Sequence, residues 1–596
     1  MKNSLTCLNE SRGLSRFIAA VIGFVLPLGN MIAQDDDDEI VTLSPFIVDA
    51  SGDVGYRATN TISGTSLNTP IKDIPMSIEV INQEFLEDTG ATNFDEALAY
   101  SSGVFLDEYT QSPGESSDGA NAPGANENAS ADRSASSRGG LGGRFDNGTI
   151  IRGFNVPFQN RDGFRYGGII AQHGVVLGGI LDTSNIQRME VVRGPNSLLY
   201  GIGVLSGIVN VIPKRPLSAQ TQSATIGFGS EGYLRGTLDV TGPIASDLFG
   251  GQLNYRVATA WEERDDWTDF RGKKLEYYVG QLEWSSEKVN ILVEGQYADQ
   301  LESGIGDQHI HDNVFAAVDL GFRNEFGEQF NWQKTLGGLP ESYRITGPDT
   351  YAQRQETNFL ANIEFTPIEN FTISAGMFRT GANEEEFNVR VATLNNRERS
   401  FNLKGVLVQR PNDPNTVNSQ EILDWMDEKV TIAEFPGEID PLDQRNMNDY
   451  RTTRYWWELE PEDSTTEQYR LRMTYSRDGE LFGKAAKHTF LVGRHDIKDE
   501  ADFTTGNSRL SWQYEDKQEL ATDDPVQFRN INDQSVIRYN GEQLSQPGFD
   551  FRNTEVWFAG HYALYQGKLF DDKLGVILGG RHDRYHARDR RYDRFD

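Results

Sequence analysis

The carboxyl-terminal two thirds of the chain contains segments that alternate strictly between apolar and polar residues. In one such segment, the residues of the apolar face are Leu253, Tyr255, Val257, Thr259 and Trp261, and those between them are mostly polar. The same alternation recurs at 289–297, 468–475 and 556–564. A period of two places one set of side chains on each face of an extended strand. The pattern therefore predicts a large antiparallel β-structure beginning at about residue 223.

Strand length and loop length distinguish a membrane barrel from a soluble sandwich. The alternating segments run for about 9–11 residues or more, as in outer-membrane barrels, whereas strands in globular proteins average about 5–6. Short turns such as 285–287 contrast with long polar stretches at 300–355 and 410–463. Short turns at one end and long loops at the other are typical of outer-membrane barrels. We expect the apolar face to contact lipid and the polar face to line the lumen.

The segment before these strands mixes strand-type and helix-type patterns. Residues 74–81 read as a strand, Asn82 is a candidate cap for a following helix, and Asn93 for a second helix at 94–100. Residues 107–148 are rich in Gly, Ser, Asn and Ala, which predicts a flexible insertion. Order resumes at Thr149, with β-type runs at 189–193 and 208–212. We expect a mixed α+β domain over residues 61–216.

The amino terminus has the features of an export signal. Lys2, Arg12 and Arg16 precede an apolar run at 17–28, and a plausible cleavage site follows near Ala33. This pattern predicts a signal peptide over residues 1–34, which contains the only cysteine, Cys7.

An isolated apolar segment follows the signal. It is preceded by the acidic run 35–39, and its residues are Ile40, Val41, Thr42, Leu43, Ser44, Pro45 and Phe46. An extended apolar segment between polar neighbours cannot bury itself locally. Residues 35–60 are therefore expected to be a linker that carries a strand for a partner protein.

Composition excludes several classes. The chain has 596 residues and a formal net charge of −33, which argues against binding nucleic acid through its phosphates. A single cysteine excludes a disulfide framework and a zinc site made of four cysteines. No apolar run reaches the ~18–20 residues of a membrane-spanning helix.

The motifs that resemble a nucleotide-binding loop or a metal site lack the residues that such sites require. Residues 201–207 have the spacing GxGxxxG and precede a β-type run, whereas a dinucleotide loop requires a helix there. The pairs His309/His311 and His582/His586 supply too few ligands for a metal site. We therefore predict no catalytic residues, no bound metal and no cofactor, and a protein that is not an enzyme.

Four segments together resemble the plug domain of TonB-dependent outer-membrane receptors. They are IPMSIEVINQEFLEDTGATNFDEALAYSSGV at 74–104, IRGF at 151–154, RDG at 161–163 and MEVVRGPNSLLYGIGVLSGIVNVIPKRP at 189–216. IRGF followed by RDG most resembles the siderophore-receptor branch. The resemblance implies a plug inside an antiparallel transmembrane β-barrel of roughly 22 strands. It also implies import of a scarce ligand, most simply a ferric siderophore, energised by TonB and its inner-membrane complex.

The resemblance assigns roles by position. Ile40–Phe46 would be the TonB box. Arg152, Arg193, Lys214 and Arg215 would form salt bridges between plug and barrel wall. Candidate ligand contacts in the upward loops are Phe158, Gln159, Tyr166, Gln172 and His173.

Two questions remain open at this point. The cargo could instead be a glycan fragment, cobalamin or another chelate, or the chain could be a surface binding or signalling receptor without transport. Residues 217–596 show only about fourteen or fifteen convincing strands, and the chain ends on a charged segment rather than a terminal amphipathic strand. The sequence therefore predicts a barrel that is incomplete, and a product truncated at its carboxyl terminus.

Overall fold

The structure is a computed structural model of the whole chain. It describes residues 44–48, 52–106, 149–156, 159–166, 179–194, 196–201, 207–305, 342, 344, 347–393, 400–403, 406–409, 452–507, 527–530, 538–539 and 550–593.

A small mixed sheet forms the centre of the amino-terminal domain, the plug. Its strand order is β3 (Ser77–Asn82), β9 (Ile186–Arg193), β10 (Gly207–Pro213), β7 (Gln159–Arg161) and β8 (Phe164–Tyr166). Only the β10–β7 pair is parallel. The expected strands at 74–81, 189–193 and 208–212 are therefore confirmed and lie side by side. Two short sheets flank them: β1 (Asn60–Thr61) with β2 (Thr69–Pro70), and β4 (Val104–Leu106) with β5 (Thr149–Ile151) and β6 (Phe154–Asn155).

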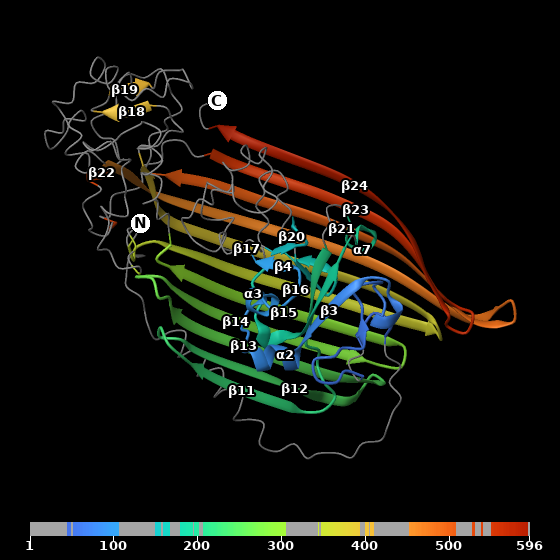
Figure 1. Ribbon diagram of the computed structural model, residues 1–596. Coiled ribbons are helices and arrows are strands. Elements are labelled where there is room, and N and C mark those ends of the chain that lie inside the picture. The colour runs from blue at the N-terminus through green and yellow to red at the C-terminus, as the bar shows by residue number, and fades with distance from the viewer. Residues whose placement is uncertain are drawn as a thin grey trace, which may run out of the picture.

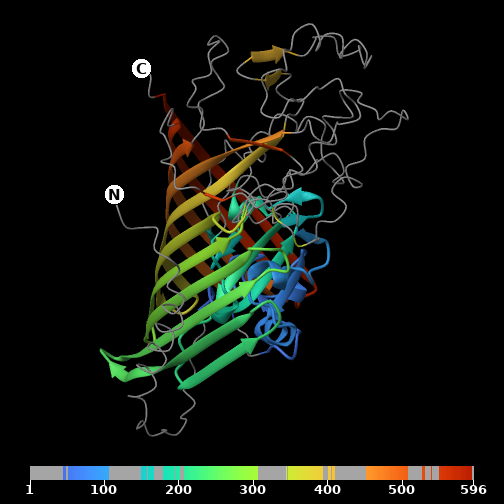
Figure 2. The ribbon, with the colours of Figure 1, turned by 90° about the vertical axis from the view of Figure 1, so that its left-hand side faces the viewer.

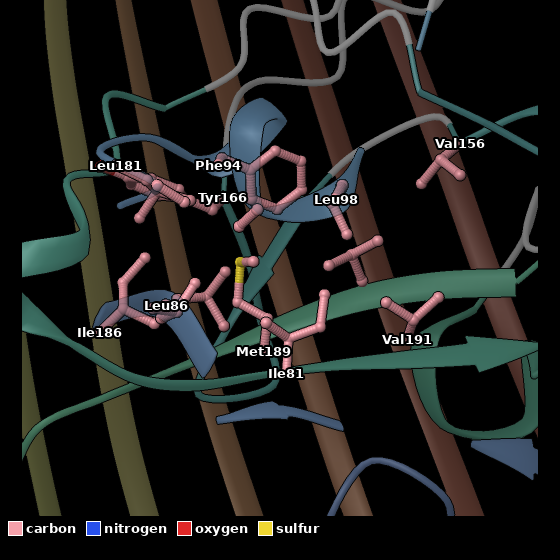
Figure 3. Close-up of a cluster of buried hydrophobic side chains, with 14 of the residues drawn as sticks. Ile81, Leu86, Phe94, Leu98, Val156, Tyr166, Leu181, Ile186, Met189 and Val191 are labelled. Carbon is pink, nitrogen blue, oxygen red and sulfur yellow. The ribbon is translucent and has the colours of Figure 1, made fainter. Parts of the chain in front are cut away.

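The helices of the plug begin where the sequence predicts. Asn82 caps α2 (Gln83–Thr89) by accepting a hydrogen bond from the Phe85 amide at 3.1 Å. Asn93 caps α3 (Phe94–Leu98) in the same way through the Glu96 amide. The α2 and α3 helices pack on the β-sheet through a core that includes Leu86, Phe94, Leu98, Met189 and Val191 (Figure 3). The remaining helical turns are η1 (Ile71–Asp73), η3 (Thr183–Asn185) and α7 (Ser197–Tyr200).

One glycine of the plug has no room for a side chain. Gly207, the first residue of β10, has φ +147°, and an added Cβ would lie 2.3 Å from the Val192 carbonyl oxygen of the neighbouring strand β9. Glycine at this position allows β9 and β10 to approach closely.

A large antiparallel sheet curves around the plug (Figures 1 and 2). Its strands in spatial order are β11 (Thr221–Phe228), β12 (Leu234–Leu248), β13 (Gly251–Asp265), β14 (Gly272–Ser285), β15 (Val289–Ser303), β16 (Tyr351–Ile368), β17 (Phe371–Thr393), β20 (Thr452–Leu481), β21 (Lys484–Asn507), β23 (Asp550–Leu569) and β24 (Leu574–Asp593). A short strand, β22 (Gln527–Asn530), pairs with the start of β20. Two further short strands, β18 (Ser400–Leu403) and β19 (Val406–Gln409), pair with each other.

The connections of this sheet are unequal, as expected. At one end, short turns join β12 to β13, β14 to β15, β16 to β17, β20 to β21 and β23 to β24. At the other end, the segments 304–350, 394–451 and 508–549 separate consecutive long strands. This arrangement is that of an outer-membrane barrel wall.

The two faces of the sheet are inverted relative to a soluble protein. Exposed apolar side chains cover its outer face over a band that we call the outer belt: Leu282, Val293, Tyr297, Phe359, Ile363, Phe365, Tyr469, Leu471, Met473, Tyr475, Phe490 and Val492. Polar side chains face inward and are buried against the plug, among them Glu262, Gln281, Glu294, Arg354, Glu356, Gln468 and Arg472. The predicted lipid-facing and lumen-facing alternation is therefore confirmed.

The sheet is open between its first and last strands. Within the described ranges, β11 pairs only with β12 and β24 pairs only with β23. The sheet comprises twelve strands in the described part of the chain. With β18 and β19, the described part of residues 217–596 holds fourteen strands, so the expected count of about fourteen or fifteen is confirmed, and the open sheet agrees with the expected incomplete barrel. No described helix is long and apolar enough to cross a membrane.

Candidate functional site: the interface between plug and sheet

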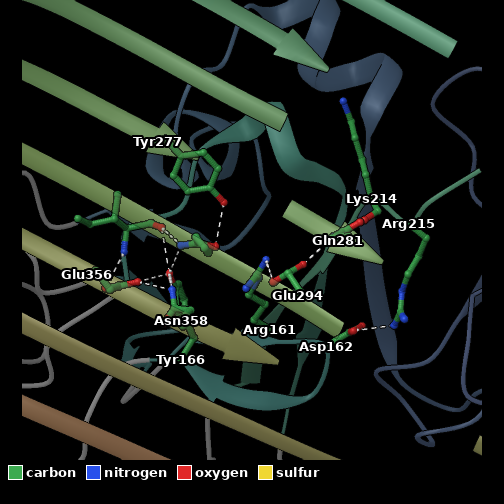
Figure 4. Close-up of polar contacts among 12 residues, drawn as sticks. Arg161, Asp162, Tyr166, Lys214, Arg215, Tyr277, Gln281, Glu294, Glu356 and Asn358 are labelled. Carbon is green, nitrogen blue, oxygen red and sulfur yellow. Dashed lines mark hydrogen bonds and ion pairs between the residues drawn. The ribbon is translucent and has the colours of Figure 1, made fainter. Parts of the chain in front are cut away.

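The β14–β16 side of the sheet presents carboxylates to the basic side chains of the plug; we call it the acidic wall. Arg161 at the end of β7 forms an ion pair with Glu294 of β15, at 2.7 Å between Nη2 and Oε1 (Figure 4). Both side chains are buried. Burial opposes the charge, but Glu294 raises the pKa of Arg161 above its ordinary value. Arg161 is therefore held charged against the wall.

Tyr166, at the end of β8, is the centre of a second attachment to the acidic wall. Its hydroxyl donates to the Glu356 carboxylate and lies 3.0 Å from the Ile180 carbonyl oxygen. The Tyr166 hydroxyl oxygen also accepts from Gln296 Nε2 at 3.0 Å and from Asn358 Nδ2 at 2.9 Å (Figure 4). Burial and Glu356 raise the pKa of this phenol well above its ordinary value. One phenol thus joins the plug to β15 and β16.

The junction between plug and sheet is held by two adjacent cations. Lys214 Nζ forms an ion pair with Asp239 of β12 at 2.9 Å, and its carbonyl accepts from Gln281 of β14. Arg215 points the other way, to Asp162 of the plug at 2.7 Å, while its carbonyl accepts from Arg256 of β13. The chain is therefore fixed from both sides where it passes from one domain into the other.

A wall arginine bridges the plug from the other direction. Arg235 of β12 pairs with Asp182 of the plug and with Glu262 of β13, both at 2.8 Å. Near the rim of the same side, Arg264 lies 3.5 Å from Glu96 of α3, and both side chains are partly exposed.

The β20–β24 side of the sheet is basic; we call it the basic wall. Arg470 donates to the Asp162 carbonyl at 2.9 Å, and its guanidinium lies 3.9 Å from the centre of the Phe164 ring. Arg581 donates to the carbonyls of Leu198 and Leu199 in helix α7. Carbonyls at a helix end lack partners within the helix, so a guanidinium stabilises them.

The segment at the start of the described chain lies against the basic wall. Phe46 is buried in a cluster with Leu199, Tyr200 and Tyr562, and the guanidinium of Arg472 lies 4.1 Å from the centre of its ring. The Asn68 amide donates to the Pro45 carbonyl at 2.7 Å. Of the predicted TonB box, Ser44, Pro45 and Phe46 are therefore docked on the plug and wall. Residues 40–43 lie outside the described ranges.

A buried carboxylate ties the following segment to the central sheet of the plug. Glu190 of β9 accepts from Thr61 Oγ1 at 2.6 Å and from the amide and hydroxyl of Ser63 at 3.0 and 2.5 Å. Burial raises the pKa of Glu190, although these hydrogen bonds oppose the shift. Asn210 of β10 also donates to the Ser63 hydroxyl, at 2.9 Å.

The cations predicted to join plug and wall occupy three kinds of position. Lys214 reaches Asp239 of β12 in the wall, whereas the Arg215 side chain reaches Asp162 of the plug. Arg193 pairs with Glu79 and Ser101, which are themselves plug residues, so these contacts lie within the plug and not on the wall as expected. Arg152 is exposed, at φ +52° in the turn between β5 and β6.

Two of the expected ligand residues are buried. Gln159 and Tyr166 lie inside the interface, so in this structure Tyr166 bonds to the wall instead of facing a ligand. Phe158, Gln172 and His173 lie outside the described residues.

The wall residues that contact the plug were not predicted from the sequence. Glu294, Glu356, Gln468, Arg470 and Arg581 occupy the polar face of alternating strands, where each looks like any other lumen residue. Their alternation shows that they face inward, but only the packed structure shows which plug residue each one meets. No group of three or more His, Cys, Asp or Glu in the described part of the chain is placed to hold a metal ion.

Comparisons with known proteins agree with this arrangement. Residues 70–208 match the family model "TonB-dependent Receptor Plug Domain". This range lies within the expected plug, residues 61–216. The chain is 26% identical over 286 residues to the ferripyoverdine receptor of Pseudomonas aeruginosa, covering 47% of this chain and 30% of that protein. It is 25% identical over 313 residues to the ferrichrome outer membrane transporter/phage receptor of Escherichia coli, covering 51% of this chain and 37% of that protein.

Solved structures extend the similarity to the sheet. The crystal structure of the ferripyoverdine receptor of P. aeruginosa superposes with a TM-score of 0.59 at 16% identity, covering 91% of this chain and 57% of that one. The ferric-catecholate import receptor of E. coli gives 0.57 at 16% identity, covering 88% and 58%. The sequence match thus spans about a third of the length of these curated relatives, and the superposition covers 57% and 58% of the two solved chains.

Proposed function

We propose that this chain is a TonB-dependent receptor of the outer membrane, which the plug-domain match, the receptor relatives and the shared fold support, and that it imports a ferric siderophore with energy supplied through TonB. The relatives it matches are named as receptors and transporters, not as enzymes. Binding and transport, without catalysis or a cofactor, account for the residues described above.

One observation carries the proposal. The plug lies on the concave side of the sheet, and buried ion pairs and hydrogen bonds hold it to both the acidic and the basic wall. Where plug and wall are in contact, buried side chains occupy the interface, so passage of a ferric chelate there requires these contacts to open. Import then requires work on the plug, which agrees with an energised partner.

The amino-terminal segment is the proposed point of attachment for that partner. In this proposal, residues 40–46 pair with TonB by strand addition. Their docked end, at Phe46, lies on the basic wall, so that tension on the segment would act first on Phe46 and then on the Ser63–Glu190 contact.

Siderophore cargo is supported by the relatives, whose names specify ferripyoverdine, ferrichrome and ferrioxamine B. In the proposed mechanism the siderophore carries its own iron ligands, so the receptor supplies none. Within this proposal the ligand contacts stay with the plug's upward loops around Phe158, Gln172 and His173.

The test is uptake of iron-55 chelates by cells that lack other siderophore receptors and express this chain. We expect accumulation that disappears without TonB or after deletion of residues 40–43, while surface binding of the chelate remains. Accumulation of cobalamin or oligosaccharide, but of no iron chelate, would show that the proposed cargo is wrong. Surface binding without uptake of any of these ligands would show that the protein is a receptor that does not transport.

Abundance provides an independent test. Outer-membrane fractions from iron-starved cells should contain more of this protein than those from iron-replete cells. Equal amounts in both would contradict a role in iron acquisition.

A further inference from the structure

Strand β24, the last strand of the sheet in Figure 1, carries a row of basic side chains on its outer face. Its even-numbered residues share the exposed face of Leu574 and Leu578, whereas Ile577, Gly579 and Arg581 face the plug. Beyond the apolar part, five successive outward positions hold imidazole or guanidinium groups, which we call the basic row: His582, Arg584, His586, Arg588 and Arg590. The chain as a whole has a net charge of −33, so this row is opposite in sign to the rest of the molecule.

The neighbouring strand does little to balance the basic row. On the outer face of β23, the residues opposite the row are His561, Ala559, Trp557, Glu555 and Asn553. Glu555 is the one carboxylate in this set, and among the ion pairs of the described residues none involves Arg584 or Arg588. Like charges on one face repel each other. An anion outside the protein is therefore the natural partner of the row.

Strands β16 and β21 show what occupies the corresponding positions elsewhere on the outer face. On β16, the outward residues that follow Phe359 are neutral: Thr357, Gln355, Gln353 and Tyr351. On β21, the outward cations are each paired with a carboxylate of the same strand: Arg494 with Asp496 at 2.7 Å, and Lys498 with Glu500 at 3.1 Å. The exposed, unpaired arginines of β24 differ from both arrangements.

The basic row begins at the height where the apolar band of a barrel ends. Arg584 lies ten residues beyond Leu574 on β24, which corresponds to roughly 25 Å of height at the usual strand tilt. The apolar band of an outer-membrane barrel is itself about 25 Å tall. Arg584 is therefore at the boundary between hydrocarbon and headgroups on the side of the long loops, and Arg588 is at the level of the headgroups.

An aromatic ring beside the row agrees with this height. Trp557 of β23 packs on the His586 ring, with centroids 5.4 Å apart. Tryptophan is enriched where a membrane protein meets the headgroups, because its ring is apolar and its N–H is polar.

We propose that the basic row binds the phosphates of a glycolipid in the outer leaflet of the membrane, while the acyl chains of that lipid pack along Leu574 and Leu578. Guanidinium groups bind phosphate through paired, charge-assisted hydrogen bonds. Each arginine near an anionic lipid surface increases affinity about fivefold. This interaction requires the outer-membrane location but does not depend on which cargo is imported.

The first test measures binding of lipid A, the diphosphorylated glycolipid anchor of lipopolysaccharide, to the full chain in micelles of a neutral detergent. The wild type should bind lipid A about tenfold more tightly than the same lipid after removal of its phosphates. R584Q/R588Q should weaken binding of lipid A about 30-fold, because two arginines are lost. R584K/R588K, which keeps both charges, should stay within about fivefold of the wild type. R477Q, which removes an exposed arginine from the outer face of β20 near the short turns, should have no effect.

Three results of this experiment would overturn the proposal. The first is equal binding of the phosphorylated and dephosphorylated lipids. The second is an equal loss of binding in R584Q/R588Q and R477Q. The third is complete competition by millimolar inorganic phosphate, which would make the row a site for free phosphate and not for a lipid.

The second test does not depend on the folding of an arginine variant. Ala559 lies opposite Arg584 on the outer face of β23, and Thr357 lies just beyond the outer belt on β16. The chain has one cysteine, Cys7, in the predicted signal peptide, so A559C or T357C would be the only thiol of the mature protein. An environment-sensitive fluorophore at A559C should shift its emission when lipid A is added, and the same fluorophore at T357C should not.

Equal shifts at both positions, or no shift at A559C, would contradict a lipid bound at the basic row. Both tests are made without a chelate. Failure of iron uptake would therefore overturn the proposed cargo and leave the lipid site to be decided by its own measurements.

Discussion

Replacing Tyr166 with Phe should detach β8 from the acidic wall without leaving a cavity. The phenol loses its hydrogen bond to the charged Glu356, which is worth about 1.5–3 kcal/mol. Gln296 and Asn358 each keep a second acceptor, the Ile180 carbonyl at 3.3 Å and the Glu356 carboxylate at 2.7 Å. Because these donors are not orphaned, we expect a total cost of about 2–3 kcal/mol. Local opening should therefore become about 30- to 150-fold more frequent.

Hydrogen exchange of the full chain in lipid vesicles measures this opening. Amides of residues 159–166 should exchange faster in Y166F by that factor. The matched control is Y297F, which removes the hydroxyl of an outward-facing tyrosine that donates to Asp299 at 3.4 Å on the exposed surface. If Y166F and Y297F exchange equally in residues 159–166, the phenol is not an attachment point and the reasoning is wrong.

Three further perturbations test other parts of the structure. Gly207→Ala should lower the stability of the plug by about 3 kcal/mol, because the position has a positive φ and no room for a Cβ. Protease should therefore digest the plug of this variant faster. Gly280→Ala, where an added Cβ has nothing within 4 Å, should not change the rate of digestion. Burial raises the pKa of Asp95 to about 6, above its ordinary 3.8, so its charge destabilises α3 above that pH. Asp95→Asn should thus raise the free energy of opening of α3, measured by hydrogen exchange, by up to about 3 kcal/mol at pH 7–8. This stabilisation should vanish near pH 4, and equal stabilisation at both pH values would refute the role of the Asp95 charge. Leu471→Lys, in the outer belt, should cost about 2–4 kcal/mol in urea unfolding from lipid vesicles, whereas Thr465→Lys, beyond the belt, should cost little; equal costs would contradict the lipid-facing assignment.

The features that sequence predicted well are those with a local cause. The period of two placed Leu471 and Met473 outside and Arg470 and Arg472 inside, because alternation is a property of the strand itself. The caps at Asn82 and Asn93 were equally readable, since each depends on an amide three residues away.

The contacts that were not predicted join distant parts of the chain. Tyr166 and Glu356 are 190 residues apart, and no local pattern marks them as partners. Tyr166 was expected to contact the ligand because aromatic groups in the plug's upward loops suit a bulky, partly aromatic chelate. Arg470 and Arg581 adjoin the same plug region only because the registers of four long strands bring them there.

The strands of this sheet are longer than the outer belt requires. On β20 the belt covers Tyr469–Tyr475, yet the strand begins at Thr452. The part before the belt extends for roughly 50 Å along the strand, or about 40 Å of height at the usual tilt. A stiff collar therefore stands clear of the lipid headgroups on the side of the long loops. Antibodies and membrane-impermeant labels can reach this collar on intact cells, so its surface can be mapped without extracting the protein.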